Sequence, residues 1–180
     1  MSPRASSRES IIDAAEKVVA EAGAGHLTLD AVAAKAKVSK GGLMYHFPSK
    51  DALLRAMVAR MVERFDTMAA DELNMLGMQK GAILKAHTLT GIGHPELNRI
   101  SAALLAASAN EPKLLTPVRD YYIKLFSKFK SAGLPFEEAA IVVLATSGLW
   151  LFELLQISPF DGRKREHIVK KLMKLAEDKE

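Results

Sequence analysis

The sequence of 180 residues contains no cysteine, so disulfide bonds, thiolate metal sites and cysteine nucleophiles are excluded. It also lacks a long apolar run: residues 139–152 form the longest stretch without a charge, and a membrane span needs about 20 residues. The first residues, MSPRASSRES, have no apolar core of the kind found in signal peptides. We therefore expect a cytoplasmic protein that does not enter a membrane.

Acidic residues are missing from one segment in particular. No Asp or Glu lies between Asp30 and Asp51, whereas the segment contains the basic residues Lys35, Lys37, Lys40 and Lys50. The formal net charge of the whole chain is +4. A charge of this sign permits a polyanionic partner without requiring one, and a locally basic segment is suited to a phosphate backbone.

The same segment has the pattern of two short helices joined by a tight turn. Thr28 can cap the first helix, and Ser39 can cap a second that runs through Phe47 and ends before Pro48. The apolar side of the first helix has helical spacing and consists of Leu29, Val32, Ala33 and Ala36. Two short helices across a turn of about three or four residues form a helix-turn-helix.

These residues resemble the signature of the tetracycline-repressor (TetR) family, which runs roughly V-S-x-G-x-L-Y-x-H-F-x-x-K-x-x-L. The residues that carry the resemblance are Val38, Ser39, Lys40, Gly41, Leu43, Tyr45, His46, Phe47, Lys50, Leu53 and Leu54. The resemblance covers Ser7 to about Leu54. It implies an all-α fold of about nine helices: an N-terminal three-helix DNA-binding bundle, followed by a C-terminal helical domain for ligand binding and dimerisation. It implies no cofactor.

The resemblance also assigns roles to individual residues. Lys40 and Gly41 fall where the family contacts base edges, and a lysine there can donate to guanine O6 or N7. The other expected DNA contacts, several of them to phosphates, are Thr28, Ser39, Gly42, Met44, Tyr45, His46 and Lys50. Gly42 replaces the usual Thr and Met44 the usual Tyr, which removes two hydroxyl groups from this surface. Lys37 replaces the usual turn glycine, so we expect it at positive φ.

Outside this segment the sequence predicts further helices, in two modules that we place at residues 1–50 and 51–180. An apolar i, i+3, i+4 stripe predicts a platform helix from Ser7 to Ala22, ended by Gly23. The remaining helices are expected from Ser49 to about Leu73, Met78 to Thr90, Pro95 to Ala109, Thr116 to Gly133, Pro135 to Leu155 and Lys164 to Glu177. No segment has the alternating pattern of a strand.

The C-terminal module is expected to bind a small hydrophobic or mildly cationic effector, as the resemblance implies. The expected ligand-binding residues are Phe65, Met68, His87, Leu104, Tyr122, Phe126, Trp150 and Glu153. A carboxylate in an apolar helix needs a cationic partner or solvent, so Glu153 can face the protein, water or the effector. Aromatic residues at helical spacing more often form a plain core than line a cavity, so a solid core is the alternative interpretation.

The helix after Pro135, AAIVVLATSGLWLFELL, is apolar on nearly every side, which predicts burial on all sides. A second copy of the chain can supply part of that cover, so we expect a homodimer through this helix and the last one. The expected dimer residues are Val143, Ala145, Leu149, Phe152, Ile168 and Leu172.

Enzyme chemistry has little support in the sequence. The histidines (His26, His46, His87, His94 and His167) include no pair at i, i+4 spacing, so we expect no metal site. No nucleophile-elbow sequence supports a Ser/His/Asp triad, and we expect no catalytic residues. The prediction is a ligand-responsive regulator, a repressor by family analogy, that binds a palindromic operator as a homodimer. The alternatives are a DNA-binding regulator without an effector, and a helical enzyme or carrier with a vestigial helix-turn-helix.

Overall fold

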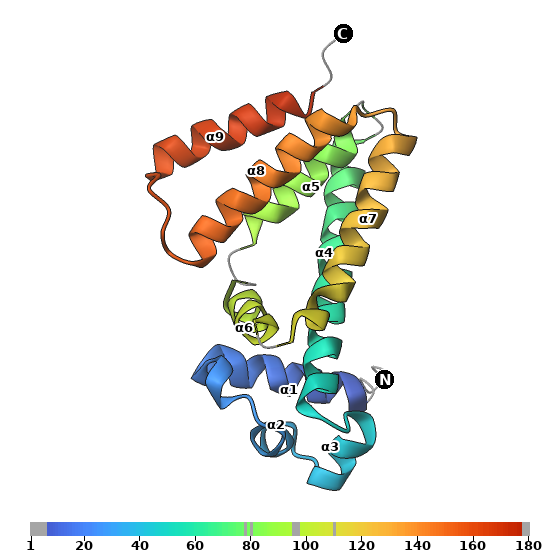
Figure 1. Cartoon of the computed structure of the whole chain (residues 1–180), viewed down its shortest axis with the longest axis vertical. Coiled ribbons are helices and arrows are strands. Elements are labelled where there is room, and N and C mark those ends of the chain that lie inside the picture. Colours follow the sequence, from blue (N-terminus) through green and yellow to red (C-terminus); the bar gives the residue numbers. More distant parts are fainter. Residues whose placement is uncertain (1–6, 78, 80, 95–97, 110, 178–180) are drawn as a thin grey trace. The chain divides into compact units, whose positions relative to one another are not determined.

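The computed structural model describes residues 7–77, 79, 81–94, 98–109 and 111–177 (Figure 1). Every regular element in these ranges is helical, which confirms the all-α prediction. The α-helices are α1 (Ser7–Ala22), α2 (Leu29–Ala36), α3 (Lys40–His46), α4 (Lys50–Leu76), α5 (Ala82–Gly93), α6 (Asn98–Ser108), α7 (Thr116–Ser131), α8 (Phe136–Leu154) and α9 (Gly162–Leu175). Two short 3-10 turns are η1 (Ala24–His26) and η3 (Pro112–Leu115). Among the described helices, none is both long enough and apolar enough to cross a membrane.

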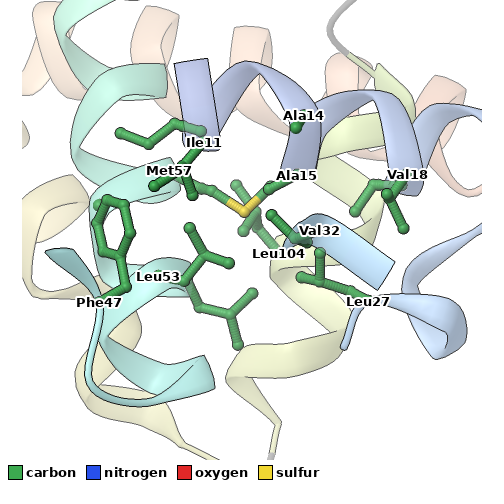
Figure 2. Close-up of a cluster of buried hydrophobic side chains, with 14 of the residues drawn as sticks. Ile11, Ala14, Ala15, Val18, Leu27, Val32, Phe47, Leu53, Met57 and Leu104 are labelled. Atoms are coloured by element: carbon green, nitrogen blue, oxygen red, sulfur yellow. The ribbon is translucent and has the colours of Figure 1, made fainter. Parts of the chain in front are cut away.

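The chain divides into two compact units, the first of which comprises Met1–Met61 and Leu97–Val118. Its core gathers apolar side chains from α1, α2, the start of α4, and α6 (Figure 2). Leu43 of α3 and Phe47 just after it are 0% and 2% exposed and join this cluster. The helix-turn-helix is therefore held by a continuous aliphatic core.

Charge as well as packing holds α1 to α4. Arg60 Nε donates to Glu16 Oε1 at 3.0 Å, and Arg60 Nη1 donates to Asp13 Oδ1. The Arg60 side chain is only 11% exposed, so these charge-assisted bonds act in a partly desolvated setting and are stronger than surface pairs. The contact fixes the platform helix α1 against the first turns of α4.

The second unit comprises Val62–Glu96 and Arg119–Glu180. Its core residues come from α5, α7, α8 and the end of α9: Leu84, Leu125, Phe129, Ala139, Val142, Val143 and Ala176. α5 and α8 lie side by side (Figure 1) and approach closely at Gly91. A Cβ at Gly91 would lie 2.8 Å from Thr146 Cγ2, so this helix crossing requires a glycine.

The structure differs from the sequence expectations in several helix bounds. α5 continues through Gly91 to Gly93, where the sequence predicts a break, because Gly91 serves the close approach of α8 and does not end the helix. α9 begins at Gly162 and ends at Leu175, two residues earlier at each end than expected. Pro95, expected to open a helix, lies outside the described residues.

The two units also divide the chain differently from the expected modules, 1–50 and 51–180. The first unit continues to Met61 within α4, and it includes α6 and η3 from the middle of the sequence. The physical reason is burial: Leu104 of α6 and Leu114 of η3 are 2% and 1% exposed within the aliphatic core of the first unit.

Candidate DNA-binding surface

Three hydroxyl side chains fix the helix starts of the first unit. Thr28, Ser39 and Ser49 each accept a hydrogen bond from the backbone N–H three residues later, at 3.1, 3.0 and 3.1 Å. These bonds confirm the predicted caps of α2 and α3 and show that Ser49 caps α4. Lys37 ends α2 with φ of 58°, the positive value expected for the residue that replaces a turn glycine. The caps and this turn set the direction in which α3 leaves α2.

α3 presents the expected DNA-contacting residues to solvent. The exposed residues of this helix are Lys40, Gly41, Gly42, Met44 and Tyr45, and His46 is half-buried. Tyr45 is 86% exposed, and its ring meets the His46 ring edge-on at 5.2 Å between centroids. Nothing lies within 4 Å of a Cβ built at Gly41, so a ligand can approach the backbone there. With Leu43 buried, α3 has one core face and one open face.

The charges near α3 are partly paired within the protein. Lys40 Nζ lies 2.9 Å from Asp30 Oδ1 and 3.2 Å from Oδ2, across the turn between α3 and α2. Lys35 Nζ lies 2.6 Å from Glu21 Oε2. Lys50, at the start of α4, is exposed. The sequence pattern missed Asp30 as the partner of Lys40, because the contact depends on how the turn places the two helices.

Four of the expected ligand residues meet in an aromatic cluster of the second unit, which we define as Phe65, His87, Tyr121, Tyr122, Phe126 and Phe129. The His87 ring centroid lies 5.7 Å from that of Phe65 and 6.2 Å from that of Tyr122. His87 Nδ1 and the Tyr121 hydroxyl share a hydrogen bond of 3.2 Å. His87 is 2% exposed, and this burial lowers its pKa to about 4, so the imidazole is neutral at pH 7.

Hydroxyl groups line part of this region. The Tyr122 hydroxyl and Ser147 Oγ share a hydrogen bond of 3.2 Å. Burial, with a smaller contribution from Asp66, raises the pKa of Tyr121 above its usual value, so its hydroxyl stays protonated. Thr146 is 1% exposed, and its Oγ1 has no hydrogen-bond partner among the described residues. Neither Thr146 nor Ser147 was predicted, since each is a single polar residue within an apolar helix.

The other expected ligand residues are not brought into the aromatic cluster. Leu104 lies in the core of the first unit, so its placement with the remaining seven is corrected: α6 packs on α1 and η1. Met68 on α4 and Trp150 on α8 are half-buried. Glu153 accepts hydrogen bonds from Arg165 Nε and Nη2, and Nη2 also donates to the Ile92 carbonyl at 2.9 Å. The carboxylate thus has a cationic partner within the protein. The second unit also has a surface groove, but none of the eight expected ligand residues lines it. The residues that line the groove are Ile83, Ser127, Lys128, Ser131 and Ala132.

Three of the six expected dimer residues are buried within the single chain. Val143 and Leu149 of α8 and Leu172 of α9 are each 4% exposed, because α5, α8 and α9 pack against one another. Ala145 and Phe152 are exposed, and Ile168 is half-buried. The exposed large apolar residues of α8 and its C-terminal end are Phe136 (66% exposed), Ile141 (60%), Leu144 (71%), Phe152 (38%) and Leu155 (49%). The last four are spaced three, eight and three residues apart and lie on one side of the helix. α8 therefore has a second apolar face that its own chain leaves open.

No three His, Asp or Glu side chains of the described ranges gather to hold a metal ion.

Comparisons with known proteins match both parts of the chain. A family model described as bacterial regulatory proteins, tetR family, matches residues 11–57. A second, described as tetracyclin repressor-like, C-terminal domain, matches residues 81–177. The helix-turn-helix that the geometry builds thus lies within the first match, and α5–α9 lie within the second.

Individual relatives resemble the chain over most of its length. The HTH-type transcriptional regulator BetI of Burkholderia thailandensis is 28% identical, over 95% of this chain and 90% of its own. The HTH-type transcriptional repressor KstR of Rhodococcus jostii is 25% identical, over 82% and 71%. A crystal structure of the multidrug binding protein EbrR complexed with ethidium has a TM-score of 0.69 and 26% identity, covering 97% of this chain and 99% of that one. The chain belongs to the TetR family of transcriptional regulators, with a DNA-binding helix-turn-helix at α2 and α3.

Proposed function

We propose that this regulator is a repressor, which binds a palindromic operator as a homodimer and releases it when a small apolar molecule binds. The observation that carries the DNA-binding part is the open face of α3. This face exposes Lys40, the backbone at Gly41 and the side chain of Tyr45. A helix of this kind reads base edges in the major groove while nearby cations hold phosphates. Repression is supported by the similarity to the repressor KstR. An operator in bacterial DNA places the protein in the cytoplasm.

Substitutions of two lysines test which residues bind phosphates and which read bases. Lys50→Ala is expected to lower affinity for all sequences alike and to reduce the salt slope by about one, since it removes a phosphate contact. Lys40→Ala is expected to relax preference at one base pair. Exposed Lys124 on α7 supplies the matched control, because Lys124→Ala removes the same charge from the second unit. If Lys40→Ala merely scales every affinity down, its assignment to base reading is wrong.

A homodimer is supported by the open apolar face of α8. Ile141, Leu144, Phe152 and Leu155 are spaced so that they form one stripe along the helix. Contiguous exposed apolar patches on a stable protein mark interaction surfaces. We propose that two copies of α8 meet through this stripe about a two-fold axis, with the exposed end of each chain's α9 helix beside it. This replaces the expected contact through Val143, Leu149 and Leu172.

The effector is supported by two observations of different kinds. EbrR, which shares 26% identity, has been crystallised with ethidium, and the aromatic cluster here combines rings with neutral hydroxyl groups. Glu153 is already paired with Arg165, and His87 is neutral at pH 7. Ethidium is a cation, but the paired carboxylate and the neutral imidazole offer no free anion for one here, so we propose an uncharged aromatic or aliphatic effector for this chain. It releases DNA only if it binds the DNA-incompetent arrangement more tightly.

Trp150 is the single tryptophan, and it lies one helical turn after Ser147, which shares a hydrogen bond with Tyr122 of the aromatic cluster. Its fluorescence is therefore a probe for binding next to the cluster. Uncharged hydrophobic compounds are expected to quench it and to weaken operator binding, and cationic compounds of similar size to do neither. Arg165→Gln releases the Glu153 carboxylate, so this variant is expected to gain affinity for cationic compounds. Compounds that bind but leave DNA affinity unchanged would separate ligand binding from regulation, and the effector proposal would then fail.

A further inference from the structure

Lys40 is the one cation on the open face of α3 among the described residues, yet it does not extend freely into solvent. Both oxygens of the Asp30 carboxylate lie within hydrogen-bond distance of its Nζ, at 2.9 and 3.2 Å. The side chains are 59% and 71% exposed, so the pair sits on the surface that DNA approaches. Asp30 lies in the first turn of α2, two residues after the capping Thr28. The pair thus joins the starts of the two helices of the helix-turn-helix.

The pairing changes what the lysine can do. An ammonium group has three N–H donors and no acceptor, so a carboxylate that takes one or two of them leaves at least one for DNA. The carboxylate also neutralises the charge that draws a lysine to phosphate oxygens. A free lysine on a flexible stem would have its ammonium attracted to the nearest phosphate, whatever the sequence.

We propose that Asp30 is a specificity-determining positioning residue, which holds the ammonium of Lys40 for a guanine edge and keeps it off the phosphate backbone. Guanine presents two acceptors in the major groove, O6 and N7, whereas adenine pairs an acceptor with a donor and cytosine presents a donor. A lysine held in place by Asp30 distinguishes these edges. The same lysine released from Asp30 contributes affinity that every sequence shares.

Asp30→Asn tests the proposal because it keeps the size of the side chain and removes its charge. Affinity for non-specific DNA is expected to rise by up to about fivefold, the range of an exposed ion pair. The logarithmic salt slope is expected to steepen by about one, since Lys40 gains a phosphate. Discrimination against a changed guanine is expected to fall by up to about fivefold. In a Lys40→Ala background, Asp30→Asn is expected to leave the discrimination at that base pair unchanged.

The chain offers a matched control in the same unit. Glu21 pairs with Lys35 at 2.6 Å, again a carboxylate and a lysine on two different helices, but away from α3. Glu21→Gln also removes one negative charge. We expect it to change both the discrimination and the salt slope less than Asp30→Asn does. Asp30→Glu retains a carboxylate and is expected to restore discrimination. Thermal melting by circular dichroism shows that each variant is folded.

The probe is a duplex that the full-length wild-type protein enriches from a random-sequence library, compared by fluorescence anisotropy with duplexes that carry each single-base change. Reduced discrimination and a steeper salt slope for Asp30→Asn, both dependent on Lys40, support the proposal. Equal changes in affinity for all duplexes, or an unchanged salt slope, overturn it. If the wild type enriches no sequence, the operator-binding function itself fails, which is a distinguishable result.

Discussion

Buried His87 makes the stability of the second unit depend on pH between about 4 and 6.5. Its pKa is about 4 in the folded protein, because it is 2% exposed among aromatic rings, and about 6.5 in an unfolded chain. The unfolded chain therefore binds a proton in this window while the folded protein does not. Stability contributed by neutral His87 is fully present above pH 6.5 and is lost progressively as the pH falls towards 4.

The size of the effect follows from the two pKa values. Between pH 7.5 and pH 5 the linkage relation gives a loss of about 2 kcal/mol in the free energy of unfolding. His87→Asn removes the titrating ring and keeps a polar group that can reach the Tyr121 hydroxyl. The smaller side chain lowers stability at every pH, so the slope, and not the absolute value, is the readout.

Urea unfolding at fixed protein concentration, from pH 7.5 to pH 5, measures this slope for both proteins. The wild type is expected to lose about 2 kcal/mol more than His87→Asn over that range. Contributions of the remaining histidines and of the carboxylates are common to both proteins and cancel in the difference. Parallel curves would show that His87 binds a proton equally in the folded and unfolded states, and the burial argument for His87 would be refuted.

Three further predictions, one of them with a control substitution, test other parts of the account. Leu144→Arg places a charge on the proposed dimer face and is expected to yield monomers in sedimentation, while a retained dimer would exclude this face. Gly81→Ala puts a Cβ into the Ala176 carbonyl at a positive φ and is expected to cost roughly 2–4 kcal/mol in urea unfolding. Gly77→Ala has a similar φ and open space, so an equal cost would disprove the clash. Gly42→Thr is expected to favour the helix by a few tenths of a kcal/mol and to raise operator affinity modestly; weaker binding would mean that DNA approaches the bare backbone.

The helix-turn-helix was predictable from sequence because its determinants are local. Caps act within three residues, the turn needs one residue at positive φ, and the apolar spacing of α1 identifies its buried face. Thr28, Ser39 and Lys37 accordingly behave as expected, and α1 has the predicted bounds. The resemblance to a family signature added the roles of exposed residues such as Lys40, which spacing alone does not assign.

The second unit was less predictable because its determinants are contacts between distant segments. Gly91 has the appearance of a helix breaker in the sequence, but it is required where α5 meets Thr146 of α8. A fully apolar helix does not reveal which side its own chain covers, so Val143 and Leu149 were expected at a dimer contact that the exposed Leu144 is better placed to make. Arg165, the partner of Glu153, lies across a loop on α9.

The reading of a palindromic operator through α3 is tested most directly by sequencing the duplexes that the full-length protein enriches from a random-sequence library. The wild type is expected to enrich an inverted repeat with a preferred guanine in each half-site, and Lys40→Ala to lose the preference at that position while keeping the rest. Enrichment of no motif, or of a motif that Lys40→Ala leaves unchanged at every position, would contradict the account.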